Sequence, residues 1–166
     1  IPVSVGNHTI IPLLENPSYF NITPSSRIVS FPAAGNSYNQ DFCITANGEH
    51  NDLDIVIIPV NNARPGFQSI YKIKYRNKGN VATEANISFN YDDTIMDFVS
   101  SSLAPNLQTN GSINWNSNLG TLYPFDNEGE VTLVFALNSP VDTPALNQND
   151  ILNFSATVTS DLADEK

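Results

Sequence analysis

The chain has 166 residues, enough for one ordinary domain or two small ones, and 40% of them are hydrophobic, which is ample for packed cores. Its 17 Asp and Glu residues against 7 Lys and Arg residues give a formal net charge of −10. This charge disfavours nucleic-acid phosphates and anionic membrane surfaces as partners. No apolar stretch approaches the roughly 18 residues of a membrane-spanning helix, so we also expect no direct membrane insertion.

Residues 1–46 are expected to form short β-strands separated by turn-forming residues. So small a segment buries little surface by itself, and we interpret it as the C-terminal part of a preceding module or as a piece docked on the domain that follows. Cys43 lies in a strand-like run and is the one cysteine, so we expect a buried, inert thiol. The expected strands are residues 1–5, 8–14, 19–22, 27–31 and 41–45.

The polar, turn-forming segment 46–52 contains no large apolar side chain and is predicted to be the boundary before a second unit, residues 47–166. An apolar, β-branched strand, residues 53–60, should follow. Pro59 predicts that this strand ends at a sheet edge, because proline cannot donate to a hydrogen-bonded ladder.

Residues 71–76 and 85–91 each alternate apolar with polar side chains, which is the period of a strand with one buried face. The intervening segment 77–80, Asn-Lys-Gly-Asn, supplies residues that accept positive φ. We therefore predict that the two strands pair with each other as one long β-hairpin.

Further strands are predicted at residues 95–100, 113–115, 131–137 and 152–158. Strands at a spacing of about ten residues, with turn signals between them and no helical period, predict an all-β fold, namely an immunoglobulin-like Greek-key β-sandwich with a small N-terminal β segment. Trp115 should fill the core between its sheets. The predicted core consists of Tyr71, Ile73, Ile87, Phe89, Trp115, Leu133, Phe135 and Phe154.

Four strings, RPGFQSIYKIKYRNKGN, FNYDDTIMDFVS, INWNSNLGTLYPF and SPVDTPALNQNDILNFSATV, resemble the conserved-repeat, DUF11-like immunoglobulin-fold modules of large secreted Bacteroidetes proteins, many of them type IX secretion cargo. The resemblance covers residues 50–160 and implies a spacer or adhesive segment without catalytic residues. It also implies a further strand beyond residue 158, which residues 159–166 do not show, so we expect an open sheet edge at 152–158. The string GNHTIIPLLENPSYFNITP resembles the last strands of prealbumin-like repeats, which implies that residues 1–46 end such a module.

Several clusters of oxygen-bearing side chains are candidates for Ca²⁺, which prefers hard oxygen ligands. They lie beside the boundary, at residues 92–97 and at residues 126–130. None has the spacing of an EF-hand loop, and solvated turn carboxylates are the alternative interpretation. The candidate ligands are Asp52, Asp54, Asp126 and Glu128, and no other cofactor is expected.

Thr94 is a candidate glycosylation site. The resembled proteins carry O-glycans at an Asp followed by Ser or Thr and an apolar residue, and Asp93-Thr94-Ile95 fits that form. The alternative is an ordinary turn threonine.

Catalytic motifs are not evident, because His8 and His50, the two histidines, lie near neither a nucleophile elbow nor an HExxH helix. We therefore interpret the chain as a non-catalytic structural or adhesive module of a large secreted or cell-surface protein. Its expected partners are neighbouring domains of the same polypeptide and a cell-surface protein or glycan. The alternative is a carbohydrate-binding accessory domain of a secreted hydrolase, which would show an exposed row of aromatic rings among Tyr38, Tyr91, Trp115 and Tyr123.

Overall fold

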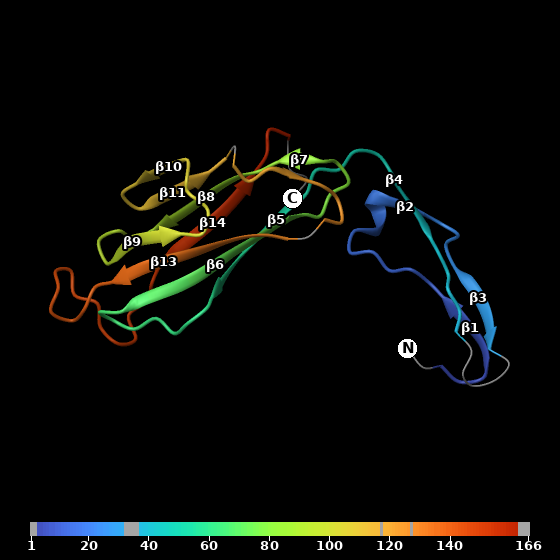
Figure 1. Cartoon of the computed structure of the whole chain (residues 1–166), viewed down its shortest axis with the longest axis horizontal. Coiled ribbons are helices and arrows are strands. Elements are labelled where there is room, and N and C mark those ends of the chain that lie inside the picture. The colour runs from blue at the N-terminus through green and yellow to red at the C-terminus, as the bar shows by residue number, and fades with distance from the viewer. Residues whose placement is uncertain (1–2, 32–36, 117, 127, 163–166) are drawn as a thin grey trace. The chain divides into compact units, whose positions relative to one another are not determined.

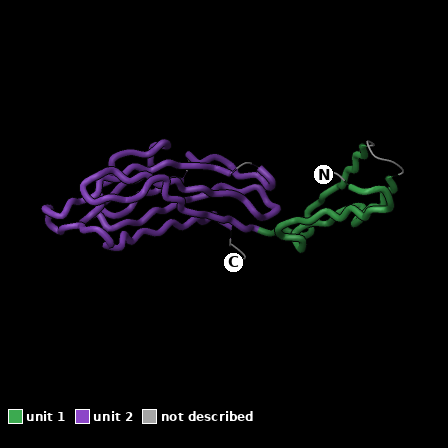
Figure 2. The backbone as a smooth tube through the Cα atoms, turned by 90° about the horizontal axis from the view of Figure 1, so that it is seen from below, with its two compact units in different colours: residues 1–50 green, residues 51–166 purple. Residues whose placement is uncertain are grey.

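The computed structural model describes residues 3–31, 37–116, 118–126 and 128–162. Within these ranges the chain consists of β-strands and loops with one short 3-10 helix, η1 (Pro17–Tyr19), so the predicted all-β class is confirmed. No helix in these ranges is long and apolar enough to span a membrane. The chain divides into two compact units, residues 1–50 and 51–166 (Figure 2).

The smaller unit contains two antiparallel two-stranded sheets. Among its described residues, Val29 is the one buried hydrophobic side chain. The predicted strand 27–31 is observed, whereas residues 3–5 are not in a strand. The pairs are β1 (Gly6–Ile10) with β3 (Arg27–Phe31) and β2 (Phe20–Thr23) with β4 (Cys43–Ala46).

Cys43 lies at the start of β4, and its side chain is exposed. The prediction of a buried thiol is therefore wrong. All four residues of β4 are exposed, because a two-stranded sheet without a second layer buries neither face well. A strand-like sequence indicates the backbone conformation of Cys43 but not whether another layer covers it.

The exposure of Cys43 is testable with a thiol reagent. We expect the folded protein to react with 5,5′-dithiobis(2-nitrobenzoate) at a rate close to that of the same protein in denaturant, because the sulfur is accessible without unfolding. Absorbance at the wavelength of the released thiolate measures the rate. Protection by orders of magnitude in the folded state would contradict the exposed position.

The larger unit consists mainly of two four-stranded antiparallel sheets (Figure 1). The first has the order β5 (Leu53–Pro59), β6 (Gln68–Asn77), β13 (Gly129–Leu137), β9 (Met96–Ser101). The second has the order β10 (Leu107–Thr109), β11 (Ser112–Trp115), β8 (Asn86–Tyr91), β14 (Phe154–Thr159). A short pair, β7 (Thr83–Glu84) with β12 (Thr121–Leu122), completes the unit.

A single hydrophobic core lies between the two large sheets and draws side chains from both. Every second residue along β6 and β13 is buried, as the period of the sequence predicts. Seven of the eight predicted core residues are buried, and Phe154 is half-buried against them. The centre is aromatic, since the ring of Phe135 lies 5.6 Å from that of Phe89, 4.9 Å from Tyr91 and 5.9 Å from Phe98.

Trp115 is fully buried in this core, as predicted. Its indole nitrogen Nε1 donates a hydrogen bond to the carbonyl oxygen of Leu103 at 2.9 Å. The polar group of the ring is therefore satisfied although the ring is desolvated.

The predicted β-hairpin is wrong. β6 pairs with β5 and β13, whereas β8 pairs with β11 and β14, so the two strands belong to different sheets. Their apolar faces meet across the core. Alternation shows that a strand has one buried face, but it does not distinguish neighbours in one sheet from strands that face each other.

The turn between these strands is held by the side chain of Asn77. Its Nδ2 donates to the carbonyl oxygens of Val81 (2.6 Å) and Leu122 (2.9 Å), and its Oδ1 accepts the backbone N–H of Gly79 (2.9 Å). The bond to Leu122 fixes the connection after β6 against β12. The chain therefore continues into the second sheet and does not fold back beside β6.

The larger unit has its two ends at one pole. Asn51, which leads into β5, donates from Nδ2 to Ser160 Oγ (2.8 Å) and to the carbonyl oxygen of Leu162 (3.0 Å), both just beyond β14. We call this end the entry pole. Figure 1 shows β5 and β14 meeting there.

The opposite end, here named the loop pole, is formed by the connections 60–67, 92–95 and 138–153. Asn138 joins all three, because its carbonyl oxygen accepts the N–H of Gly66 (2.9 Å) and its Nδ2 donates to the carbonyl oxygens of Thr94 (3.0 Å) and Pro144 (2.8 Å). The loop pole is therefore a connected surface and not three separate loops.

The edge expected at residues 152–158 corresponds to β14, which stands last in the strand order of its sheet. Strand β5 of the other sheet runs alongside it. Pairing of this edge with another chain stays a prediction.

The position of Phe135 in the core predicts a large loss of stability for Phe135→Ala. Removing a fully buried ring that contacts several other rings should lower the free energy of unfolding by about 3–5 kcal/mol, measured by denaturant titration of the Trp115 fluorescence. The matched control is Phe67→Ala, where the ring is 67% exposed and the change should stay within about 0.5 kcal/mol. Similar losses for both variants would contradict the assignment of the core.

Candidate functional site

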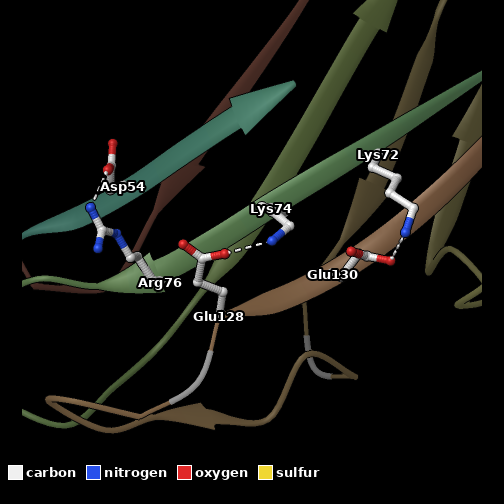
Figure 3. A network of polar contacts seen from close by, with 6 residues as sticks. All are labelled: Asp54, Lys72, Lys74, Arg76, Glu128 and Glu130. Atoms are coloured by element: carbon white, nitrogen blue, oxygen red, sulfur yellow. Dashed lines mark hydrogen bonds and ion pairs between the residues drawn. The ribbon is translucent and has the colours of Figure 1, made fainter. Parts of the chain in front are cut away.

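The outward face of the first sheet, here named the charged face, carries a row of ion pairs (Figure 3). Strand β6 presents cations between its buried residues, and β5, β13 and Glu128 just before β13 present carboxylates toward them. The side chains are roughly one-third exposed or more, apart from that of Lys78. The pairs are Lys72 Nζ–Glu130 Oε1 (2.7 Å), Lys74 Nζ–Glu128 Oε2 (2.8 Å), Arg76 Nη2–Asp54 Oδ2 (3.5 Å) and Lys78 Nζ–Asp54 Oδ2 (3.8 Å).

These pairs set the electrostatics of the face. The hydrogen bond and charge of Lys74 lower the pKa of Glu128, and the same contact raises the pKa of Lys74. Four of the seven Lys and Arg residues of the chain are in these pairs. The face is therefore internally neutralised, and individual pairs this exposed stabilise the fold only weakly.

The four candidate calcium ligands lie in different settings. Asp52 is buried before β5, and its carbonyl oxygen accepts the N–H groups of Lys78 (2.8 Å) and Gly79 (3.1 Å). Asp54 and Glu128 face the cations of β6 on the charged face, while Asp126 is exposed in the loop before β13. Within the described ranges, no three His, Cys, Asp or Glu side chains are grouped so as to hold a metal. The calcium site stays a prediction.

Thr94 is exposed in the turn between β8 and β9, at the loop pole. Its Oγ1 donates to Asp92 Oδ1 at 2.6 Å, and its backbone N–H donates to the same oxygen at 3.1 Å. The hydroxyl is thus accessible at a structured turn, and its glycosylation stays a prediction.

The four aromatic residues named for a sugar-binding platform do not form a row in the larger unit. Trp115 is fully buried and Tyr91 packs against the core, whereas Tyr123 is 55% exposed. Tyr38 is exposed in the smaller unit. The exposed ring at the loop pole is Phe67, which the sequence pattern did not single out.

The loop pole contains a hollow of about 520 Å³. Its floor is apolar, with Leu137 and Leu146 buried and Leu152 half-buried. Its walls are mostly polar, with Ala63 and Pro65 as the apolar members, and come from the connections 60–67 and 138–153. The wall residues are Asn62, Ala63, Arg64, Pro65, Asn147, Gln148, Asn149 and Asp150.

A second hollow of about 560 Å³ shares Asn62 and Arg64 with the first. It is also lined by Asn61, Phe67 and Gln68. Arg64 therefore stands between two neighbouring depressions. In the described part of the chain Arg64 makes no ion pair.

Backbone hydrogen bonds fix the connections around these hollows. Leu137 donates its N–H to the carbonyl oxygen of Phe67 (3.1 Å), and Leu146 donates to that of Ser139 (3.3 Å). The N–H and Oγ of Ser139 both donate to Asp142 Oδ2 (2.6 and 2.7 Å), and these bonds lower the pKa of Asp142.

Gly66 lets the two connections approach each other. Its φ is +79°, and a Cβ at this position would lie 3.2 Å from the Cβ of Ser139. The close approach of these two connections therefore depends on a glycine at position 66.

Sequence reasoning missed this site because its residues come from two connections that are far apart in the sequence, residues 62–65 and 146–152, and that carry no motif. A signal was present in the run Asn147-Gln148-Asn149, which is rich in amides, and in Arg64, which is remote from acidic neighbours in sequence. Neither signal indicates that the two segments meet.

Comparison with protein-family models and with curated proteins gives no match to this chain. The class that the fold defines is an all-β protein with a two-sheet sandwich. The resemblance to DUF11-like modules stays a prediction.

The charged face predicts a pH-dependent effect of Glu128→Gln. The folded pKa of Glu128 lies below its ordinary value of 4.5, so its stabilising contribution is present above about pH 4.5 and is lost as the pH falls through the lowered pKa. We expect the variant to have a lower Tm than the wild type at pH 7 and an equal Tm at the acid end. Thermal melts across this pH range measure the difference.

The matched control is Glu84→Gln, which removes the same charge at an exposed position without a described ion pair. Its Tm difference should be smaller at pH 7. Raising the salt concentration to about 1 M should shrink the effect of Glu128→Gln, since screening weakens exposed pairs. A difference that persists at low pH would show that the loss is not electrostatic.

Proposed function

We propose that this chain is a non-catalytic adhesive module of a large secreted or cell-surface protein. In this proposal the larger unit is an immunoglobulin-like Greek-key sandwich related to DUF11-like modules, and residues 1–46 belong to a neighbouring prealbumin-like module of the same polypeptide. Its partner is a cell-surface protein or glycan that meets the loop pole.

The observation that carries the proposal is the position of the unit's two ends. Asn51 is hydrogen-bonded to Ser160 and Leu162, so the segment before β5 and the segment after β14 lie together at the entry pole. The hollows and the exposed Thr94 lie at the opposite pole. A unit held at one pole presents the other to its surroundings, which suits binding better than the transmission of load along a rod.

The core supports this role energetically. β6 and β13 are paired over eight residues, from Gln68–Ala136 to Tyr75–Gly129. Their buried faces join the aromatic cluster. This rigid frame positions the loop pole without contributing chemistry of its own, an arrangement common to binding loops on sandwich scaffolds.

The alternative function, a carbohydrate-binding accessory domain of a secreted hydrolase, is favoured by one observation. The second hollow combines the amide side chains of Asn61, Asn62 and Gln68 with the exposed ring of Phe67. The adhesive module and the accessory domain would belong to different kinds of protein. Both would bind their ligand at the loop pole.

Pulling the module by chosen residues tests whether it is an adhesive unit or a load-bearing spacer. The variant Cys43→Ser removes the natural cysteine, and new cysteines then serve as attachment points for the handles of an optical trap. With Glu49→Cys and Asp161→Cys the force is applied at the entry pole. The hydrogen bonds of β5 and β14 should then break one after another, at a low force in an optical trap.

The comparison uses handles at Val141→Cys and Asp161→Cys, which load β14 along its length so that its bonds to β8 must break together. We expect this second geometry to withstand the higher force. A higher force for the entry-pole pair would mean that the unit is built to carry load in series, and the adhesive proposal would give way to a spacer.

A further inference from the structure

We propose that the hollow at the loop pole is a binding site for a carboxylate-bearing saccharide, with Arg64 pairing the carboxylate and the surrounding amides binding the hydroxyl groups. This inference rests on the proposed adhesive function and names its ligand class.

The shape suits a small ligand. A volume of about 520 Å³ lies within the usual range for ligand pockets, about 300–1,000 Å³. The floor of Leu137, Leu146 and Leu152 gives the carbon face of a sugar ring an apolar surface. The adjoining hollow continues from the first past Arg64, which leaves room for a second ring.

The second hollow carries a positive charge, opposite to the net charge of the molecule, because Arg64 is the one charged residue in its described lining, whereas in the first hollow Arg64 is accompanied by Asp150. The chain carries a net charge of −10, and four of its cations lie in the ion pairs of the charged face. Arg64 lies in the wall of both hollows without an ion pair in the described residues. A guanidinium group offers a planar pair of N–H donors that matches a carboxylate.

The acidic group in the described lining does not compete for Arg64. Asp150 Oδ2 accepts the backbone N–H of Asn147 at 2.7 Å and its Nδ2 at 3.4 Å. This carboxylate therefore holds the loop 147–150, and in the described residues it makes no ion pair with Arg64, so the guanidinium group can pair with an anionic ligand.

The hydrogen-bonding groups of the hollow suit a ligand with hydroxyl groups. Asn62, Gln148 and Asn149 each bring an amide that both donates and accepts, as a row of sugar hydroxyl groups requires. Phe67, 67% exposed beside Arg64 in the second hollow, supplies an apolar face for the next ring. A peptide carboxylate would also use Arg64, so the test below compares a peptide with the sugars.

The site is also preformed. The backbone bonds from Gly66 to Asn138 and from Leu137 to Phe67 hold the wall in place, so little ordering is needed on binding. Asn149 has a φ of +75°, a conformation that is also natural for glycine, which provides a variant that removes one amide without straining the loop.

The test measures binding to the whole 166-residue chain by isothermal titration calorimetry. The probes are glucuronic acid, a trimer of galacturonic acid, the neutral sugars glucose and galactose, acetate, and a short peptide with a free terminal carboxylate. We expect the acidic sugars to bind about tenfold more tightly than the neutral sugars, acetate or the peptide, the size of effect that a charge-assisted hydrogen bond gives.

Three variants locate the site. Arg64→Gln should remove the preference for acidic over neutral sugars, and Asn149→Gly should weaken both kinds of sugar. Phe67→Ala should weaken the trimer more than the monosaccharide. The matched control is Arg27→Gln, which removes an exposed charge from β3 of the smaller unit and should leave binding unchanged. Melting curves confirm that each variant is folded.

Equal binding of acidic and neutral sugars, or an Arg64→Gln variant that binds as the wild type does, would overturn the proposal. Binding of the peptide as tightly as the acidic sugars would overturn the saccharide assignment. Each of these results would leave the adhesive proposal standing, because the pulling experiment depends on the unit's ends and not on the hollow.

Discussion

The burial of an aromatic cluster between two four-stranded sheets is the interaction on which the larger unit depends. Phe89 and Phe135 stack at its centre, one from each sheet, and Trp115 lies fully buried beside them with its N–H satisfied by Leu103. Packing of this kind requires both sheets at once, since neither sheet alone can remove its apolar face from water. This two-sided burial turns the inner face of each sheet toward the core. The charged residues therefore lie on the outer face, and the connections lie at the two poles.

The smaller unit shows the contrast. Its paired strands are as regular locally as those of the larger unit, but each sheet has two strands, and Val29 is the one buried hydrophobic side chain in its described residues. Hydrogen-bonded strands without a covering layer leave apolar side chains such as Ile28 and Ile44 in contact with water. The exposure of Cys43 is a consequence of the same deficiency.

The sequence predicts the larger unit's core well because alternation along β6, β8 and β13 reports directly which side chains are buried. It fails where the information is not local. Pairing of β6 with β8 cannot be separated from packing of β6 over β8, since both give the same period, and the deciding bond from Asn77 to Leu122 spans 45 residues. The hollow around Arg64 and Asn149 is hidden for the same reason, because its walls come from two distant connections.

The hydrogen bonds from Asn51 to Ser160 and Leu162 have a consequence for how such a unit is joined to other proteins. A domain whose first and last strands end beside each other can be placed within a surface loop of a host domain without prising the host apart. The same closeness allows circular permutation, in which a short linker joins the old ends and new ends are opened elsewhere. We therefore expect the larger unit to keep its fold when the order of its strands along the chain is permuted.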